Sequence, residues 1–275
     1  MLRFERNGLV TAGLPLILAA VTLLVSCGQD TPDEVPIIPE GAVDMGIVLT
    51  NADGTSYNLY WAESNLCESG LCPKPEDFGD YYAWGETQPY YTSGHSLDDP
   101  CSDWRSGRES GYYWGSYGLC NGDNNKLTRY CPPDRTDYWG GQGSPDGKTE
   151  FSDYGYADDA ARAVLGGEWR MPTRKEWTSL CEQCDWTWIN VNGVVGYQFT
   201  ADNGNSIFIP AAGYRMDDVL REVGSSANYW SSTADTEYPD YAWYLFTKKD
   251  RYVGEYHSSR YYGHSVRPVA AIPIK

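Results

Sequence analysis

Residues 166–177, Gly-Gly-Glu-Trp-Arg-Met-Pro-Thr-Arg-Lys-Glu-Trp, mark a junction between a loop and a helix and constrain the fold more than any other stretch. Thr173 and Glu176 have the Thr-x-x-Glu spacing of a capping box, in which each side chain accepts a bond from the other residue's backbone N–H. The apolar residues that follow share one helical face: Trp177, Leu180, Cys181 and Cys184. The sequence therefore predicts a helix from Arg174 to about Cys184 that packs on a core.

Turn and cap signals predict further short elements on both sides of this junction. Residues 158–165 have the pattern of a short helix with acidic residues in its first turn, and Gly166 ends it. Asp53-Gly54 and Asp202-Asn203-Gly204 each separate two apolar runs, which is typical of a β-hairpin. Later strands are expected at residues 229–233, 242–246, 252–256 and 265–269. Residues 63–157 lack any sustained period and are predicted to be irregular, held together by disulfides and aromatic packing.

The N-terminus has the features of a processed lipoprotein signal. Arg3 and Arg6 precede the apolar run 9–25, and Leu-Val-Ser-Cys at 24–27 resembles a bacterial lipobox. We expect residues 1–26 to be the signal peptide and Cys27 to be lipidated, so that the chain's membrane contact is a lipid anchor. An uncleaved membrane anchor is the alternative, but Pro15 interrupts a run that is already short for a span.

Residues 27–43 are acidic and rich in proline, which predicts an extended tether before a single domain at 44–275. Acidic residues directly after the lipid-bearing cysteine resemble a surface-export signal of lipoproteins in some gut bacteria. This predicts the outer face of the outer membrane. The formal net charge of −17 argues against nucleic acid as a partner, because no basic patch exists to neutralise phosphates.

A cell-surface location is an oxidising compartment, and the spacing of the cysteines predicts disulfides there. Cys67–Cys72 and Cys120–Cys131 would each close a short loop, and both are predicted to be disulfides; Cys101 is expected to be left over. The Cys181-x-x-Cys184 pair falls inside the predicted helix and not at its N-terminus, where the dipole lowers a thiol pKa. Structural sulfur is the favoured interpretation, with redox and zinc roles as alternatives.

Four other motifs occur in order around the 166–177 junction. They are Asp-Phe-Gly-Asp-Tyr-Tyr-Ala-Trp-Gly-Glu-Thr at 77–87, Asn-Gly-Asn-Ser-Ile-Phe-Ile-Pro-Ala-Ala-Gly-Tyr-Arg at 203–215, Tyr-Trp-Ser-Ser at 229–232, and Ser-Val-Arg-Pro-Val at 265–269. Together they resemble, over about residues 44–270, the major paralogous domain named after Fibrobacter succinogenes, which is common in secreted lipoproteins of gut bacteria. The Arg-Met-Pro-Thr-x-x-Glu-Trp core is more distantly similar to the formylglycine-generating, sulfatase-modifying enzymes.

Both resemblances imply an α+β, C-type-lectin-like fold with a small mixed or antiparallel sheet, two short helices and long irregular loops. Ser64 stands where family members usually carry a cysteine, so a family disulfide to Cys184 is not implied. The paired active-site cysteines of the formylglycine-generating enzymes have no match here, so their oxidase activity is not implied either. Within the shared motifs, the aromatic residues Trp169 and Trp177 are expected in the core. The arginines Arg170 and Arg267 are expected to bond buried loop carbonyls.

No catalytic residue can be assigned, because the sequence lacks a Gly-x-Ser-x-Gly elbow, a His-Glu-x-x-His helix, a P-loop and an EF-hand loop. The three histidines, His95, His257 and His264, are expected to be surface or loop residues. Residues 121–124 and 202–205 are interpreted as turns, with calcium binding as an alternative. Paired carboxylates at 98–99, 158–159 and 217–218 are expected to be solvated or to cap helices, although they leave a glycosidase couple open.

Residues 227–262 hold 8 of the 23 tyrosines, interspersed with Ser, Asn and Asp. Such a mixture offers rigid aromatic area and adaptable hydrogen bonds, as in evolved binding faces. It also resembles the variable regions of proteins that are diversified by retroelements, which use C-type-lectin-like folds. The predicted ligand contacts are Tyr229, Tyr238, Tyr241, Tyr244, Tyr252, Tyr256, His257, Tyr261 and Tyr262.

The sequence thus predicts a surface-exposed lipoprotein that acts as a binding or adhesion module for a glycan or protein ligand. A polysaccharide-active enzyme or its accessory protein is one alternative. A passive structural subunit of a surface assembly is the other.

Overall fold

The computed structural model describes residues 37–91, 111–249 and 252–274, with the side chains of residues 252 and 253 excepted. Four predictions concern residues that the structure does not describe: the signal peptide, the lipidation of Cys27, the left-over Cys101 and the position of His95. Within the described part, no helix combines the length and the apolar character needed to cross a membrane.

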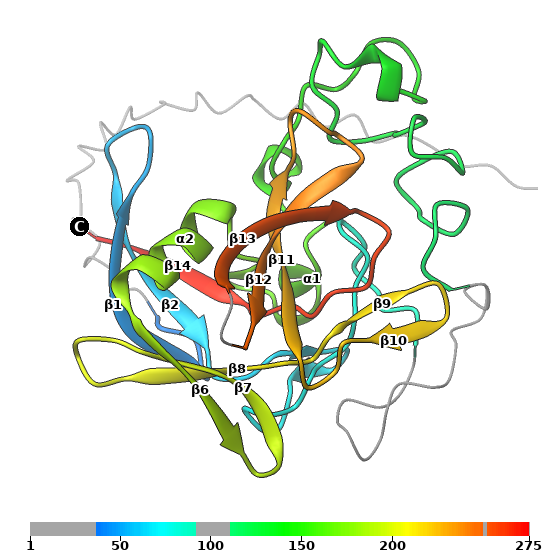
Figure 1. Ribbon diagram of the computed structural model, residues 1–275. Coiled ribbons are helices and arrows are strands. Elements are labelled where there is room, and N and C mark those ends of the chain that lie inside the picture. Colours follow the sequence, from blue (N-terminus) through cyan, green and yellow to red (C-terminus); the bar gives the residue numbers. More distant parts are fainter. Residues whose placement is uncertain (1–36, 92–110, 250–251, 275) are drawn as a thin grey trace, which may run out of the picture. The chain divides into compact units, whose positions relative to one another are not determined.

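The domain belongs to the α+β class, as predicted, and most of its strands are antiparallel (Figure 1). The described residues contain two α-helices, α1 (Ala160–Leu165) and α2 (Arg174–Gln183). Two short 3₁₀ helices, Thr136–Tyr138 and Phe151–Tyr154, interrupt the long irregular segment. Helix α1 has Asp159 as its N-cap in place of the expected acidic first turn, and its C-cap Gly166 has a φ of 66° that suits glycine.

The first sheet joins both ends of the domain in the order β1-β2-β14-β5. The predicted hairpin is present as β1 (Ala42–Thr50) and β2 (Ser56–Ala62). The C-terminal strand β14 (Val269–Pro273) runs antiparallel between β2 and β5 (Trp169–Arg170). Figure 1 shows this arrangement, with the red C-terminal strand beside the blue hairpin.

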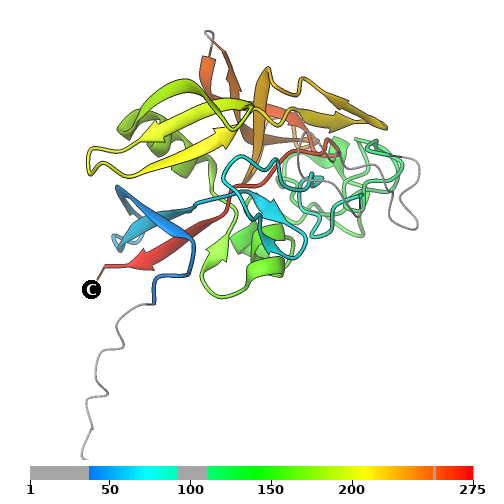
Figure 2. The ribbon, with the colours of Figure 1, turned by 90° about the horizontal axis from the view of Figure 1, so that it is seen from below.

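A second sheet, ordered β6-β7-β8, contains the other predicted hairpin. Strands β7 (Val194–Thr200) and β8 (Ser206–Pro210) flank the Asp202-Asn203-Gly204 turn. Strand β6 (Asp185–Val191), which the sequence did not predict, follows α2 directly and pairs with β7 along its whole length. Figure 2 shows this sheet in yellow-green next to the first.

The third sheet, ordered β11-β12-β13, carries most of the tyrosine-rich segment. It consists of β11 (Ser226–Ala234), β12 (Tyr241–Lys248) and β13 (Tyr252–Ser259). Two small hairpins complete the domain, β3 (Leu66–Cys67) with β4 (Gly70–Leu71), and β9 (Tyr214–Met216) with β10 (Val219–Arg221).

The strand expected at 265–269 begins only at Val269. The residues before it, His264 and Ser265, instead form single bridges with Tyr82 and Tyr229. These two residues therefore link the irregular segment, through Tyr82, to strand β11, through Tyr229.

Helix α2 begins with the predicted capping box. Thr173 accepts the backbone N–H of Glu176 at 3.2 Å, and the Thr173 backbone N–H donates to Glu176 Oε2 at 2.7 Å. The same carboxylate accepts two bonds from the Arg170 guanidinium, at 2.7 and 2.5 Å, and one from the Tyr57 hydroxyl at 2.9 Å. Glu176 is 0% exposed. One buried carboxylate thus ties β5, α2 and β2 together.

Burial alone would raise the pKa of Glu176 and lower that of Arg170, since it disfavours each charged form. The mutual attraction and hydrogen bonds of the pair outweigh burial. The pKa of Glu176 therefore lies below its ordinary value, and the pKa of Arg170 lies above its own. Both groups are ionised at neutral pH.

The other shared residues of the family-like motifs are core residues, as expected. The rings of Trp61 and Trp177 lie 4.6 Å apart, and the Trp177 indole donates to the Trp230 carbonyl at 3.2 Å. Arg267, fully buried, bonds three acceptors in different segments: Asn65 Oδ1, the Ala62 carbonyl and the Phe208 carbonyl. These bonds tie the end of β2 to β8 through one buried side chain.

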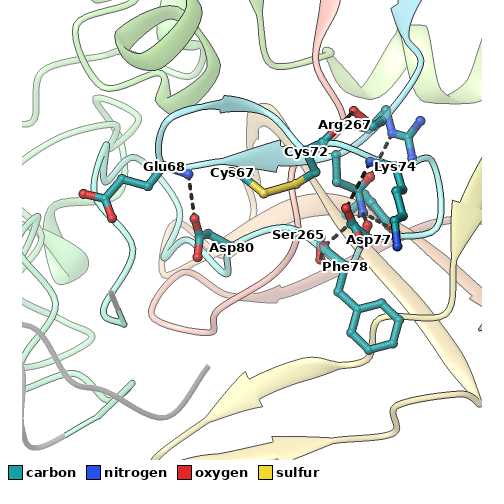
Figure 3. The surroundings of a disulfide bond; sticks show 12 residues. Cys67, Glu68, Cys72, Lys74, Asp77, Phe78, Asp80, Ser265 and Arg267 are labelled. Carbon is teal, nitrogen blue, oxygen red and sulfur yellow. Dashed lines mark hydrogen bonds between the residues drawn. A yellow bond between two sulfur atoms is a disulfide. The ribbon is translucent and has the colours of Figure 1, made fainter. Parts of the chain in front are cut away.

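The predicted Cys67–Cys72 disulfide is present and closes the β3–β4 hairpin, with 5.2 Å between the two Cα atoms (Figure 3). Within this loop the Glu68 backbone N–H donates to the Asp80 carboxylate at 2.6 Å, so the hairpin is also tied to the following segment.

The predicted Cys120–Cys131 disulfide is wrong, because both residues are free thiols. Cys120 Sγ donates to the Trp114 carbonyl at 3.3 Å, and Cys131 Sγ donates to the Arg135 carbonyl at 3.2 Å. The backbone of Cys120 bridges to Leu127 and not to Cys131. Each sulfur is therefore held against a carbonyl of its own loop, which sequence spacing alone cannot reveal.

Cys181 and Cys184 are also free, and their surroundings are those of structural thiols. Burial raises the pKa of Cys181 to about 12 and that of Cys184 to about 11. Such thiols stay protonated at neutral pH and are poor nucleophiles. The geometry supports the structural interpretation of this Cys-x-x-Cys pair.

Replacing Glu176 by Gln should lower the free energy of unfolding by about 3–5 kcal/mol, because Arg170 would be left as an uncompensated buried charge. Urea unfolding followed by tryptophan fluorescence measures this change. The matched control is Glu255→Gln, which removes the more exposed pair with Arg174 at 3.4 Å. That substitution should cost less than about 1 kcal/mol. Equal effects of the two substitutions would contradict a dominant role for the buried pair.

The contribution of Glu176 should depend on pH in a defined direction. Its pKa in the folded protein lies below the ordinary value of 4.5, so its contribution is fully present above that value. The contribution is lost as the pH falls through the folded pKa. The stability difference between the wild type and Glu176→Gln, measured by urea unfolding from neutral to acid pH, should therefore be constant near neutrality and shrink in acid. A difference that grows in acid would have the wrong sign.

Thiol labelling should separate the cysteines into two classes. In denaturant without reductant, iodoacetamide should modify Cys120, Cys131, Cys181 and Cys184 but neither Cys67 nor Cys72, as measured by peptide mass spectrometry. In the native protein Cys131 should react slowly, because burial raises its pKa to about 11. Recovery of a disulfide-linked peptide that contains Cys120 and Cys131 would contradict the assignment of both as free thiols.

Candidate functional site

A cavity of about 290 Å³ lies on one face of the β11-β12-β13 sheet. It is bordered by that sheet, by the β9–β10 hairpin region and by the segment that follows β13. The residues that line it are Tyr214, Glu222, Asn228, Tyr241, Tyr244, Phe246, Tyr256, His257, Ser258, Ser259, Tyr262 and His264. Many of these are the residue types expected of a recognition surface.

Strand alternation decides which residues of the sheet face this cavity. Tyr244 on β12 is paired with Tyr256 on β13 and with Trp230 on β11, so these three side chains project from the same face. Phe246 is two residues further along β12 and projects likewise. The opposite face carries Leu245 and is covered by α2.

Aromatic rings form the floor and the rim of the cavity. The Tyr244 ring lies 6.3 Å from that of Tyr256 and 6.2 Å from that of Phe246. Tyr244 is only 8% exposed, whereas Tyr256 is 56% exposed. On the other side Tyr214 and Tyr262 are stacked, with ring centroids 5.7 Å apart. Tyr244 thus belongs to the floor, and Tyr256 offers its ring to solvent at the rim.

The polar groups around these rings are mostly uncharged. Burial raises the pKa of Tyr244 and of Tyr214, and the neighbouring Glu222 carboxylate raises that of Tyr214 further. Both phenols therefore keep their protons and can donate hydrogen bonds. Glu222 lies 3.5 Å from the Lys248 ammonium, and both side chains are 37% exposed. Asn228, 2% exposed, donates to Ser226 Oγ at 2.8 Å.

His264 lies at the floor. It stands outside the named strands, as expected of a loop residue, but it is buried and not on the surface. It is 1% exposed, and its ring stacks on that of Trp230 with centroids 4.0 Å apart. Its backbone exchanges two hydrogen bonds with Tyr82, at 2.9 and 3.1 Å. The backbone bridge to Tyr82 thus places His264 in the core, although its neighbours in the sequence are mostly polar.

His257 borders the cavity but projects from the opposite face, because it is paired with Trp243 across the strands. Its Nδ1 lies 2.5 Å from Asp235 Oδ2, and its ring packs 5.4 Å from that of Trp243. The other oxygen of Asp235 accepts the backbone N–H groups of Glu237 and Tyr238. Asp235 thus fixes both the loop between β11 and β12 and the orientation of the imidazole.

The structure brings some of the predicted contact residues together and separates others. Those that line the cavity are Tyr241, Tyr244, Tyr256, His257 and Tyr262. Tyr238 lies in the β11–β12 loop, 43% exposed, and Tyr261 packs with its ring 5.1 Å from that of Trp114. The side chain of Tyr252 lies outside the described residues.

The prediction of Tyr229 as a ligand contact is wrong. It is paired with Leu245 and so projects from the face that α2 covers, where it is 0% exposed. Its hydroxyl donates to the Pro210 carbonyl and accepts a bond from the Asn65 amide, each at 2.9 Å. A shift of one residue along the strand separates this core tyrosine from the cavity face.

Sequence reasoning did not select Tyr214, Glu222, Phe246 or His264 as candidate ligand contacts. Both Tyr214 and His264 lie outside the tyrosine-rich segment 227–262. The β9–β10 hairpin and the bridge to Tyr82 bring them to the cavity. Phe246 carried a usable signal, because it stands two residues after Tyr244 in the same predicted strand.

A second hollow beside the start of α2 contains two buried carboxyl groups. A cavity of about 160 Å³ there is lined by Glu150, Glu176, Tyr57 and Arg170, among others. Burial raises the pKa of Glu150, whose oxygens accept the hydroxyls of Ser232 and Thr233 at 2.9 and 2.5 Å. Both carboxyl groups are thus bonded to neighbouring elements, and this arrangement holds the fold together.

The sequences Asn-Gly-Asp-Asn at 121–124 and Asp-Asn-Gly-Asn at 202–205 form turns, with φ values of 80° at Gly122 and 87° at Gly204. Among the residues that the structure describes, no group of three or more His, Cys, Asp or Glu side chains converges as a metal site would require.

Comparisons of the chain with protein-family models, with curated proteins and with solved structures give no match.

Proposed function

We propose that the chain is a cell-surface lipoprotein, anchored through Cys27, whose domain has a C-type-lectin-like fold and binds a ligand in the cavity beside β12 and β13. The resemblance to the Fibrobacter succinogenes paralogous domain supports this fold. So does the architecture, in which a C-terminal strand pairs with the N-terminal hairpin while two short helices and a long irregular segment surround the sheets.

One observation carries the proposal: tyrosines that the sequence marks as a recognition surface converge on a concave site. Tyr244, Tyr256 and Tyr262 border the same cavity, together with the amide of Asn228 and the hydroxyl-bearing Ser258 and Ser259. Tyrosine and serine in this combination give rigid contact area and adaptable hydrogen bonds at a low cost in conformational entropy.

Binding explains the lining better than catalysis does. Among the described residues that line the cavity, Glu222 is the only carboxylate, and it is paired with Lys248. A glycosidase needs two carboxyl groups that flank the bond to be cleaved. The proposal is therefore a module that retains its ligand, either a glycan or a protein.

Replacing Tyr256 by Ala should weaken binding by about tenfold or more, because truncation of an aromatic hot-spot residue costs about 2 kcal/mol or more. Tyr256 is suited to this test, since its exposed ring can be removed without opening the core. The measurement is retention of the full-length protein, solubilised in detergent, on a panel of immobilised polysaccharides and extracellular-matrix proteins. Trp186→Ala is the matched control, because Trp186 is 44% exposed and does not line the cavity.

Three outcomes would count against the proposal. Release of shortened products from a polysaccharide would indicate an enzyme. Retention that Tyr256→Ala leaves unchanged would place the binding surface elsewhere. Co-purification with other surface proteins, in the absence of any retained ligand, would indicate a structural subunit of an assembly.

A further inference from the structure

We infer that the cavity takes one uncharged, hydroxyl-bearing sugar residue, with His264 as the polar contact at its floor. This inference rests on the proposed binding function and specifies its ligand. It is carried by three features of the cavity: an imidazole without a partner, the charges of the lining residues, and the cavity's size.

The first feature is the position of His264. The residue is 1% exposed and lines the cavity, and its Nδ1 makes no hydrogen bond to any residue that the structure describes. Its ring is held between Trp230, at 4.0 Å, and Tyr244, at 4.6 Å. Buried polar atoms are nearly always hydrogen-bonded in folded proteins. Nδ1 is itself closed to solvent, so a ligand that bonds it must shift the ring or its neighbours slightly; an unpartnered imidazole nitrogen beside the cavity is the polar group that such a ligand would satisfy.

The protonation state of His264 limits what this ligand can be. Burial lowers the pKa of His264 well below its ordinary value, so the ring is neutral. A neutral imidazole has one N–H donor and one lone-pair acceptor. A hydroxyl group can form a hydrogen bond with either nitrogen, because it both donates and accepts. The phenols of Tyr244 and Tyr214, which keep their protons, add further partners of the same kind.

The charges around the cavity disfavour ionic ligands. Among the described lining residues there is no Lys or Arg, and Glu222 contributes a carboxylate. A sulfated, phosphorylated or carboxylated ligand would therefore find no counter-charge among these lining residues. An organic cation would gain from the aromatic rings, but the Glu222 carboxylate already faces the Lys248 ammonium at 3.5 Å. An uncharged ligand meets neither obstacle.

The size of the cavity indicates a single ring. Its volume of about 290 Å³ lies just below the range of small-molecule sites, which is about 300–1,000 Å³. The exposed ring of Tyr256 stands at the rim, where it can stack on the next part of a longer chain. The cavity thus fits the terminal residue of a neutral oligosaccharide.

The test is binding of neutral methyl glycosides, namely those of glucose, galactose, mannose, fucose and N-acetylglucosamine, to the full-length protein by saturation-transfer NMR and calorimetry. At least one should bind. His264→Phe keeps the ring that stacks on Trp230 but removes the hydrogen bond, and should weaken this binding by roughly tenfold or more. Trp186→Ala, outside the cavity, should leave it unchanged. Near-UV circular dichroism checks that each variant is folded.

A second readout does not depend on a variant. The chain has three histidines, so the imidazole nitrogens can be followed individually in a protein labelled with ¹⁵N-histidine. The His264 nitrogens should report a neutral ring, and their shifts should change when the glycoside binds. Shifts that move only at His257 would overturn the assignment of His264.

Other results distinguish this inference from the proposed function. If choline or trimethyllysine binds and no glycoside does, the cavity is a cation site and the inference fails, while the binding function stands. If Tyr256→Ala abolishes retention on a protein ligand and no glycoside binds, the inference again fails alone. If nothing is retained on any polysaccharide or protein and no glycoside binds, both fail.

Discussion

The buried carboxylate of Glu176 is the interaction on which the arrangement of elements depends. Arg170 from β5 and Tyr57 from β2 both bond to it, and the carboxylate also caps its own helix. Because a buried charge is tolerated only when it is paired and fully hydrogen-bonded, these partners must meet at one place. Their meeting sets the direction of α2. In turn, α2 covers one face of the β11-β12-β13 sheet and leaves the other face to the cavity.

In the long irregular segment, buried arginine side chains bond backbone carbonyls that have no partner in a sheet. Buried guanidinium groups replace the ladders that strands would have provided. Arg260, 0% exposed, donates to the carbonyls of Arg129 and Tyr130, and it lies 4.5 Å over the Trp84 ring. Arg267 likewise bonds the carbonyls of Ala62, at the end of β2, and of Phe208 in β8. Loops held in this way can carry His264 and its neighbours to a defined place without regular structure.

Local signals predicted much of the secondary structure, because caps and tight turns act within a few residues. The capping box, the Gly166 stop and the Asp202-Asn203-Gly204 turn are all found where they were expected. Strand β6 was not predicted, although its sequence, Asp-Trp-Thr-Trp-Ile-Asn-Val, contains the Trp, Thr, Ile and Val residues that are enriched in strands. The Cys120–Cys131 pairing failed because closeness in sequence says nothing of where each sulfur points.

By itself, the sequence determined the caps of both helices, two β-hairpin turns and the enrichment of tyrosine in residues 227–262, since these depend on neighbours along the chain. Only the tertiary structure decided which tyrosines meet. Strand parity assigned Tyr244 and Tyr256 to the cavity and Tyr229 to the core, although all three belong to the same run. A bridge to Tyr82 brought His264 beneath them. Parity and long-range bridges are set by packing against distant segments, which no local pattern records.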